Sequence, residues 1–88
     1  MELKETVKFM NSDSYRARFI AEYWQTKIRY EKLKDFTNKI EAAIYNGTDE
    51  PEHDCPLHLL REQQGAMGKY LHMLELRAII EKINLEDK

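Results

Sequence analysis

Apolar residues recur along much of this chain at alternating intervals of three and four, the spacing that one face of an α-helix requires. The longest such run begins at Tyr15 and stops at Asn46-Gly47, where glycine favours a helix end because it accepts a left-handed backbone. We therefore predict a helix over residues 15–46, with Ile20, Trp24 and Ile28 widening its apolar stripe. The stripe itself consists of Phe19, Tyr23, Thr26, Tyr30, Leu33, Thr37, Ile40 and Ile44.

A second apolar row begins at Leu57 and fades near Ile83. Pro56 is expected in the first turn of this helix, where its missing N–H costs nothing. A shorter helix is predicted over residues 2–10, and the tail over residues 85–88 is expected to fray. No segment has the pattern of a strand. The predicted fold is all-α: a single domain, residues 1–88, in which two long helices form an antiparallel hairpin after a short N-terminal helix.

The chain is too short to cover its own apolar surface. A domain of 88 residues buries only roughly 60–65% of its unfolded surface. Cys55 is the only cysteine, so no internal disulfide can compensate. Each long helix has an apolar face wider than one partner helix covers. We therefore expect the remaining faces to meet other copies in a homo-oligomer.

Basic and aromatic side chains alternate over residues 8–36. This stretch holds seven of the nine aromatic residues, together with Lys8, Arg16, Arg18, Lys27, Arg29, Lys32 and Lys34. Rings can stack on bases and cations can hold phosphates; the alternative is an ordinary helix with an aromatic core face and a charged outer face. The net charge of −2 disfavours a general DNA binder. No apolar run is long enough to predict a membrane span, and a lone cysteine fits a reducing cytoplasm.

Catalytic motifs are missing from the sequence. There is no nucleophile–base set, glycine-rich phosphate loop or paired-carboxylate signature, so we expect neither an enzyme nor a cofactor. His53, Cys55 and His58 lie close together, but their spacing fits no standard zinc site, and no metal is expected. Gly65 and Gly68 inside the second helix each cost about 1 kcal/mol relative to alanine. Such glycines indicate close helix packing or a backbone left open to a ligand.

The whole chain resembles the anti-CBASS cyclic-nucleotide sponges of tailed phages, in particular their T-even-phage member. Gln63-x-Gly65-x-Met67 is similar to a Gln-x-Gly-x-Met element of that family. Lys27 falls where the family has a phosphate-binding lysine, when four apolar positions are kept in phase: Ile20, Tyr23, Leu33 and Phe36.

The resemblance implies a homohexamer that binds cyclic oligonucleotides such as cyclic GMP-AMP and sequesters them without cleavage. The setting it implies is the host bacterial cytoplasm, where these messengers would otherwise activate a CBASS effector. It implies a pocket between protomers in which Lys27 holds phosphate and an aromatic ring stacks on a base. Some members bind cyclic trinucleotides at a separate pocket, for which the corresponding region here contains Arg61, Gln63 and Gly65.

The stacking ring has two candidates. The family has a Tyr-Arg pair before its lysine, and the same offset here falls on Ser12. Phe9 follows Lys8 in a context similar to that of the family tyrosine, whereas Tyr15-Arg16 retains the dipeptide. Both remain open at this point.

Two other functions compete with sequestration. The first is a helical adaptor that docks on a host protein through its aromatic stripe. The second is a weak single-strand nucleic-acid binder, whose affinity would fall steeply with salt and grow with strand length. Only a sponge should take up small cyclic nucleotides with a stoichiometry fixed by its oligomer.

Overall fold

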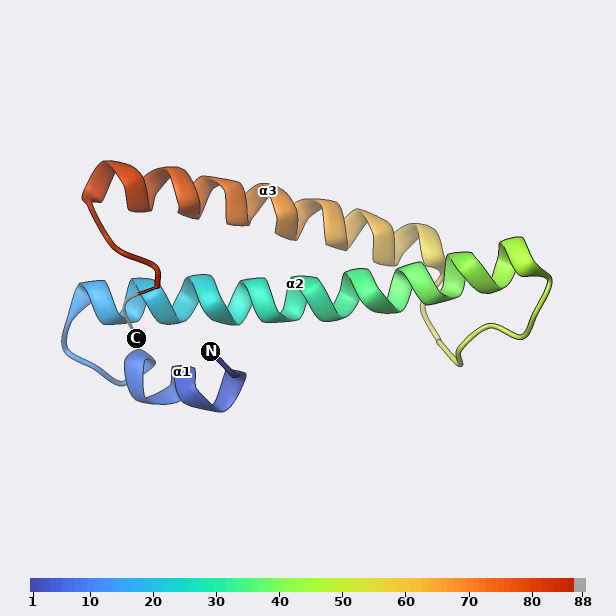
Figure 1. Cartoon of the computed structure of the whole chain (residues 1–88), viewed down its shortest axis with the longest axis horizontal. Helices are drawn as coiled ribbons and strands as arrows, with labels where there is room; N and C mark the ends of the chain where they lie inside the picture. The colour runs from blue at the N-terminus through green and yellow to red at the C-terminus, as the bar shows by residue number, and fades with distance from the viewer. Residues whose placement is uncertain (87–88) are drawn as a thin grey trace.

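Three helices make up the protein. The computed structural model describes residues 1–86, with α1 (Leu3–Met10), α2 (Tyr15–Asn46) and α3 (Leu57–Glu81). α2 and α3 lie antiparallel along a 49 Å axis, and α1 packs beside the N-terminal half of α2 (Figure 1). No strand occurs in residues 1–86. The predicted all-α hairpin with a short N-terminal helix is therefore confirmed.

The ends of the long helices follow local sequence signals. Ser14 caps α2 by accepting a hydrogen bond from the amide of Ala17 (3.3 Å). At the other end Gly47 has a φ of 68°, the left-handed conformation that glycine tolerates. Pro56 has an extended backbone and caps α3, so it lies one position before the first turn in which we expected it. Its carbonyl accepts the amides of Leu59 and Leu60.

The apolar core is concentrated at one end of the hairpin, which we call the three-helix end (residues 1–30 and 68–86). The buried cluster there consists of Phe19, Ile20, Tyr23, Leu71, Leu74, Ala78 and Ile83. Partly buried side chains close its sides: Met1, Phe9, Trp24, Tyr30 and Leu85. The N-terminus and the described segment that follows α3 both lie beside α2 in this region (Figure 1). Four separate segments therefore contribute to one core.

The C-terminal segment folds back onto that core. Lys82 ends α3 with a φ of 58°, and the amide of Ile83 bonds the carbonyl of Ala78 (2.8 Å). The indole Nε1 of Trp24 then donates to the carbonyl of Leu85 (2.7 Å). The prediction of a frayed tail is wrong for Leu85, because this docking fixes it; residues 87–88 lie outside the described residues.

The other end, the two-helix end (residues 31–67), consists of parts of α2 and α3 and the connection between them. Ile40 is fully buried there, but so is Thr37, whose hydroxyl donates to Gln64 (2.7 Å) and accepts from Arg61 (2.8 Å). Arg61 also bonds Glu41 (2.5 Å). We call this group the polar layer; its members are Thr37, Asn38, Glu41, Arg61 and Gln64. It joins the two helices beyond the apolar cluster of the three-helix end.

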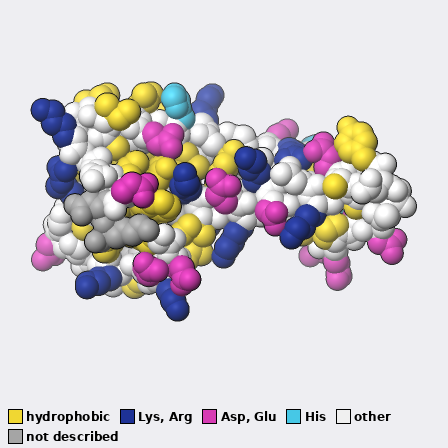
Figure 2. Space-filling view, in the orientation of Figure 1, with side chains coloured by type: hydrophobic (Ala, Val, Ile, Leu, Met, Phe, Trp, Pro, Cys, Tyr) yellow, Lys and Arg dark blue, Asp and Glu magenta, His cyan; other side chains and the backbone are white. Residues whose placement is uncertain are grey.

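The outward side of α3 remains apolar and exposed. Large side chains on it are Leu59, Tyr70, Met73, Leu76 and Ile80. Hydrophobic side chains gather along the upper edge of the molecule, over the C-terminal half of α3 (Figure 2). The single chain leaves this face uncovered. This agrees with the expectation that the apolar face of each long helix is wider than one partner helix covers.

The two helical glycines differ. A Cβ on Gly68 would lie 3.3 Å from the ring of Tyr30, so close packing between α2 and α3 accounts for this glycine. A Cβ on Gly65 would meet nothing within 4 Å. Gly65 therefore has no packing reason within one chain.

Candidate functional site

Lys27 is the centre of a cationic–aromatic site on the flank of α2. Its ammonium lies 5.7 Å from the ring centroid of Tyr23 and 5.9 Å from that of Trp24, within the range of cation–π attraction. It also donates to the hydroxyl of Tyr23 (3.4 Å), and this bond raises the pKa of Lys27. The side chain is half-buried. Lys27 is thus held as a cation against two rings.

The two rings are themselves fixed. Tyr23 is buried and donates its hydroxyl to Glu75 of α3 (3.1 Å), while burial raises the pKa of that hydroxyl. Trp24 is tied to the tail through Leu85 and meets Tyr23 edge-on, with centroids 5.4 Å apart. Glu75 is linked to Lys27 by hydrogen bonds through Tyr23, and the charges of Glu31 and Glu75 also help to raise the pKa of Lys27. Within residues 1–86, no carboxylate forms an ion pair with Lys27.

Tyr15 and Arg16 connect the start of α2 to the end of α3. The hydroxyl of Tyr15 donates to Glu81 (2.7 Å) and accepts from Arg77 (2.7 Å), and the bond to Glu81 raises the pKa of Tyr15. Arg16 donates to the backbone carbonyl of Lys82. Tyr15 as a residue nevertheless remains 48% exposed. The pair therefore combines structural contacts with an exposed aromatic residue.

Phe9 and Lys8 occupy different environments although they are neighbours. Phe9 is half-buried against the core cluster, and Lys8 is exposed in the last turn of α1. Along α2, Tyr15 and Lys27 are separated by about 18 Å of helix. One chain therefore does not bring Tyr15 and Lys27 to a common site; a site that uses both needs a second copy.

The residues considered for a second pocket do not converge either. Arg61 points into the polar layer, whereas Gln63 is exposed and contacts only Met67 (4.0 Å). Because successive helical residues are about 100° apart, Gly65 shares a side of α3 with Arg61 and Gln63 lies on the opposite side. Arg61 has an ordinary structural role in one chain, whereas Gln63 and Gly65 are exposed on opposite sides of α3.

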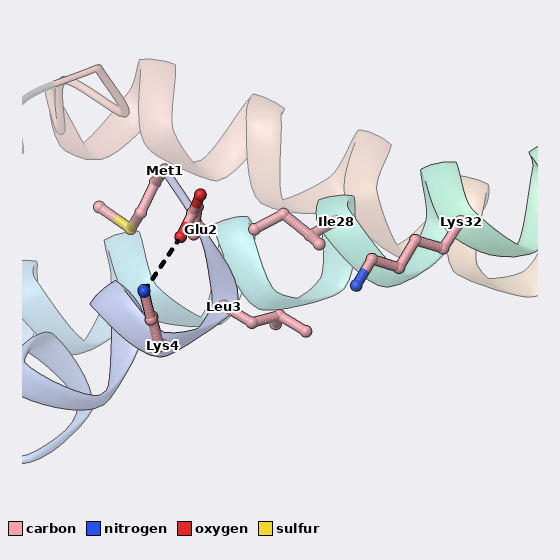
Figure 3. Close-up of a pocket in the computed structure, with 6 residues that line it drawn as sticks. All are labelled: Met1, Glu2, Leu3, Lys4, Ile28 and Lys32. Carbon is pink, nitrogen blue, oxygen red and sulfur yellow. Dashed lines mark ion pairs between the residues drawn. The ribbon is translucent and has the colours of Figure 1, made fainter.

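A groove between α1 and α2 contains Lys4 and Lys32, neither of which the sequence assigned to a binding site. It has a volume of about 490 Å³ and is lined by Met1, Glu2, Leu3, Lys4, Ile28 and Lys32. Lys4 and Lys32 lie at opposite ends of it with Ile28 between them (Figure 3). Lys4 pairs loosely with Glu2 (3.8 Å), and in the part of the chain that the structure describes Lys32 has no ion pair. The sequence feature that could have indicated this groove is the spacing of Gln25, Ile28 and Lys32, which places them on one side of α2.

A second hollow, of about 350 Å³, lies under the connection between α2 and α3. Its lining residues are Phe36, Glu52, His53, Asp54, Cys55 and Leu60. Two carboxylates in the lining disfavour an anionic ligand. Within residues 1–86, no three His, Cys, Asp or Glu side chains lie close enough to hold a metal ion.

Comparison with known families gives a match to the Sequestin family. The model of the Sequestin family matches residues 13–80, which include α2, nearly all of α3 and the connection between them. Lys27, the Tyr15-Arg16 pair and residues 61–65 lie inside the matched range, and Phe9 lies outside it. Comparisons with curated proteins and with solved structures give no match. None of the described helices is long and apolar enough to cross a membrane.

Proposed function

Because the chain belongs to the Sequestin family, we propose that it binds cyclic oligonucleotides and sequesters them without cleaving them. The family name denotes sequestration. The identity of the ligand rests on the resemblance to the anti-CBASS sponges, and the setting we propose is the host bacterial cytoplasm during phage infection. There the protein would remove the messenger before it reaches a CBASS effector.

The observation that carries this proposal is the arrangement around Lys27. An ammonium that is fixed by two rings but paired with no carboxylate in residues 1–86 retains its charge for an outside anion. A phosphate is the anion that such a site suits, since a charged hydrogen bond contributes about 1.5–3 kcal/mol. The neighbouring rings hold the lysine in place, so little side-chain entropy is lost when a ligand binds.

Of the two candidate stacking rings, we propose Tyr15. Phe9 already packs against the core, whereas Tyr15 is 48% exposed as a residue and its hydroxyl is held by Glu81 and Arg77. A ring fixed in this way is a prepared platform for a base, and one such stack contributes about 1–3 kcal/mol. Arg16 lies beside it and Lys8 lies on the exposed side of α1, where either could support phosphate.

A complete site requires more than one copy. Tyr15 and Lys27 are about 18 Å apart along one helix, so we propose that the ring of one protomer meets the lysine of another. A cyclic dinucleotide has two bases and two phosphates in near two-fold symmetry, and a symmetric interface offers two lysines and two rings. The uncovered outward side of α3, with Tyr70 and Met73, is the surface that we propose for assembly, with a hexamer as the expected product.

The test is native mass spectrometry of the purified protein with cyclic dinucleotides, a cyclic trinucleotide and a linear dinucleotide as control. We expect an oligomer mass with a fixed number of cyclic ligands and no retention of the linear one. The protein is then heat-denatured and the supernatant chromatographed. Intact ligand should return in full, and Tyr15→Ala should bind less than Phe9→Ala. Linear products, or turnover beyond one ligand per site, would make the protein an enzyme instead.

The alternative is a helical adaptor that acts on a host protein, and the exposed apolar side of α3 is the observation that favours it. An adaptor would use that side for its target and would give a monomer without bound nucleotide in the same mass spectra. A protein that stays monomeric and takes up no cyclic nucleotide would therefore replace the sponge with the adaptor.

A further inference from the structure

The connection between α2 and α3 is fastened by one histidine. The Nδ1 atom of His53 lies 2.7 Å from the backbone carbonyl oxygen of Cys55, and its Nε2 atom lies 3.0 Å from a carboxylate oxygen of Glu50. The imidazole ring also meets the ring of Phe36 on α2 edge-on, with centroids 6.3 Å apart. A single side chain thereby joins both halves of residues 48–56 to the long helix.

Both partners of the ring are hydrogen-bond acceptors. A neutral imidazole has one N–H, and its other nitrogen carries a lone pair. A neutral His53 would therefore direct a lone pair at either a carbonyl or a carboxylate oxygen. Only the imidazolium, which donates from both nitrogens, satisfies both contacts. The side chain is 19% exposed, so water has limited access to relieve a mismatch.

We propose that His53 is a pH-operated latch, whose protonated ring holds residues 48–56 against Phe36 and whose deprotonation releases the half that contains Glu50. The contact to Cys55 persists in the neutral form, because one N–H can remain on Nδ1. The contact to Glu50 is lost, because a bare Nε2 then faces a carboxylate that is still charged. This inference is independent of nucleotide binding.

The surroundings of the latch agree with this direction. The hydrogen bond to Glu50 is the largest of the effects that raise the pKa of His53, followed by the bond to the Cys55 carbonyl. Titratable groups near the ring come from the connection itself: Glu50, Glu52, Asp54 and the Cys55 thiol. From α2 and α3 the nearest lining residues are Phe36 and Leu60, which do not titrate. Because the pKa of His53 is higher in the folded chain than in the unfolded chain, the latch stabilises the connection fully at pH values below the unfolded pKa of His53. That contribution is lost as the pH rises through the folded pKa.

The first experiment is nitrogen-15 NMR of the histidine rings in the full-length protein. At pH 6 both ring nitrogens of His53 should be protonated, and the midpoint of its titration should lie above that of the same residue in urea. Hydrogen exchange of residues 48–51, corrected for the intrinsic effect of pH, should then increase across this midpoint. The increase should be about tenfold for each pH unit by which the folded midpoint exceeds the unfolded one.

Two variants separate a latch from a general effect of pH. In Glu50→Gln the amide can accept from Nε2–H or donate to a bare Nε2, so protection should become independent of pH. In His58→Gln, an exposed neighbour in the first turn of α3, the wild-type dependence should remain. Three results would overturn the proposal. The first is a titration midpoint of His53 in the folded protein at or below its midpoint in urea. The others are hydrogen exchange of residues 48–51 that does not change across the midpoint, and a Glu50→Gln variant whose exchange depends on pH as in the wild type.

Discussion

The two ends of the hairpin use the same pair of helices but are stabilised by different means. At the three-helix end, α1 and the C-terminal segment close the sides of α2 and α3, and the core is an apolar cluster with Leu74 fully buried. At the two-helix end neither α1 nor the C-terminal segment is present; the connection between the helices packs against Phe36 through His53, and the fully buried Thr37 is part of the polar layer. At the two-helix end, hydrogen bonds between the helices therefore replace part of the apolar packing.

The two ends also differ in charge. The three-helix end carries Lys27, and Lys4 lies in the groove between α1 and α2. The connection at the two-helix end is acidic, with Asp49, Glu50, Glu52 and Asp54. We therefore expect an anionic ligand to bind near the three-helix end, on the part of the chain with the larger core.

The largest expected effect is the loss of a core side chain at the three-helix end. Leu74→Ala should lower the free energy of unfolding by about 2–5 kcal/mol, because it removes buried methyl groups and leaves a cavity. Urea denaturation measures this. His72→Ala, an exposed neighbour on α3, should stay within about 0.5 kcal/mol of the wild type. Equal effects at the two positions would mean that the apolar cluster is not the stabilising core.

The next effect tests the polar layer. Arg61→Ala leaves the hydroxyl of Thr37 and the carboxylate of Glu41 without a donor, which should cost about 1–3 kcal/mol. Hydrogen exchange should increase at the two-helix end and stay unchanged around Leu74. Lys39→Ala removes only an exposed pair with Asp35 and should cost at most about 0.5 kcal/mol. Exchange that increases equally at both ends would show that the ends are not separate units.

A smaller effect distinguishes the two glycines of α3. Gly65→Ala should stabilise the chain by about 0.5–1 kcal/mol, since the new Cβ meets nothing and the helix is favoured. Gly68→Ala should increase the stability less, because its new Cβ would lie 3.3 Å from the ring of Tyr30 and press on it. Thermal unfolding of the two variants provides the comparison. A larger increase in stability for Gly68→Ala than for Gly65→Ala would contradict close packing at Gly68.

The smallest effect is expected at low pH. The hydrogen bond from Tyr15 holds the pKa of Glu81 below its usual value. This contact therefore stabilises the fold fully above the pKa of the unfolded glutamate, near pH 4.3, and is lost as the pH falls through the lower folded pKa. Glu81→Gln should show a weaker loss of thermal stability between neutral and acid pH than Glu62→Gln, an exposed control on the same helix. Identical acid profiles would show that the contact with Tyr15 is not formed in solution.

Much of the fold follows from the sequence. The spacing of apolar residues predicted α2 and α3, and Gly47 marked the end of α2 because helix termination there depends on nearby residues alone. Periodicity assigns a residue to a side of its helix but does not set the register between helices. The contacts of Tyr15 with Glu81 and of Trp24 with Leu85 join residues more than sixty positions apart in sequence, and for that reason they were not predicted.

The candidate site was predicted less completely. The resemblance singled out Lys27, and the structure adds the two rings that hold it. The groove with Lys4 and Lys32 was missed, because it forms only when α1 lies against α2. Arg61 was considered for a ligand and contacts the polar layer instead, since a sequence does not reveal which charged side chains find partners across a hairpin.

The most direct test of the account is isothermal titration of the tightest-binding cyclic dinucleotide into three proteins: the wild type, Lys27→Glu and Lys34→Glu. Lys34 is an exposed lysine two turns further along α2 and controls for the change in net charge. Lys27→Glu should lose at least about 2 kcal/mol of binding free energy, roughly thirtyfold in Kd, because a charged hydrogen bond is replaced by repulsion. Lys34→Glu should bind like the wild type, and circular dichroism should show all three folded. A folded Lys27→Glu variant with wild-type affinity would contradict the central claim that this lysine holds the phosphate of a sequestered ligand.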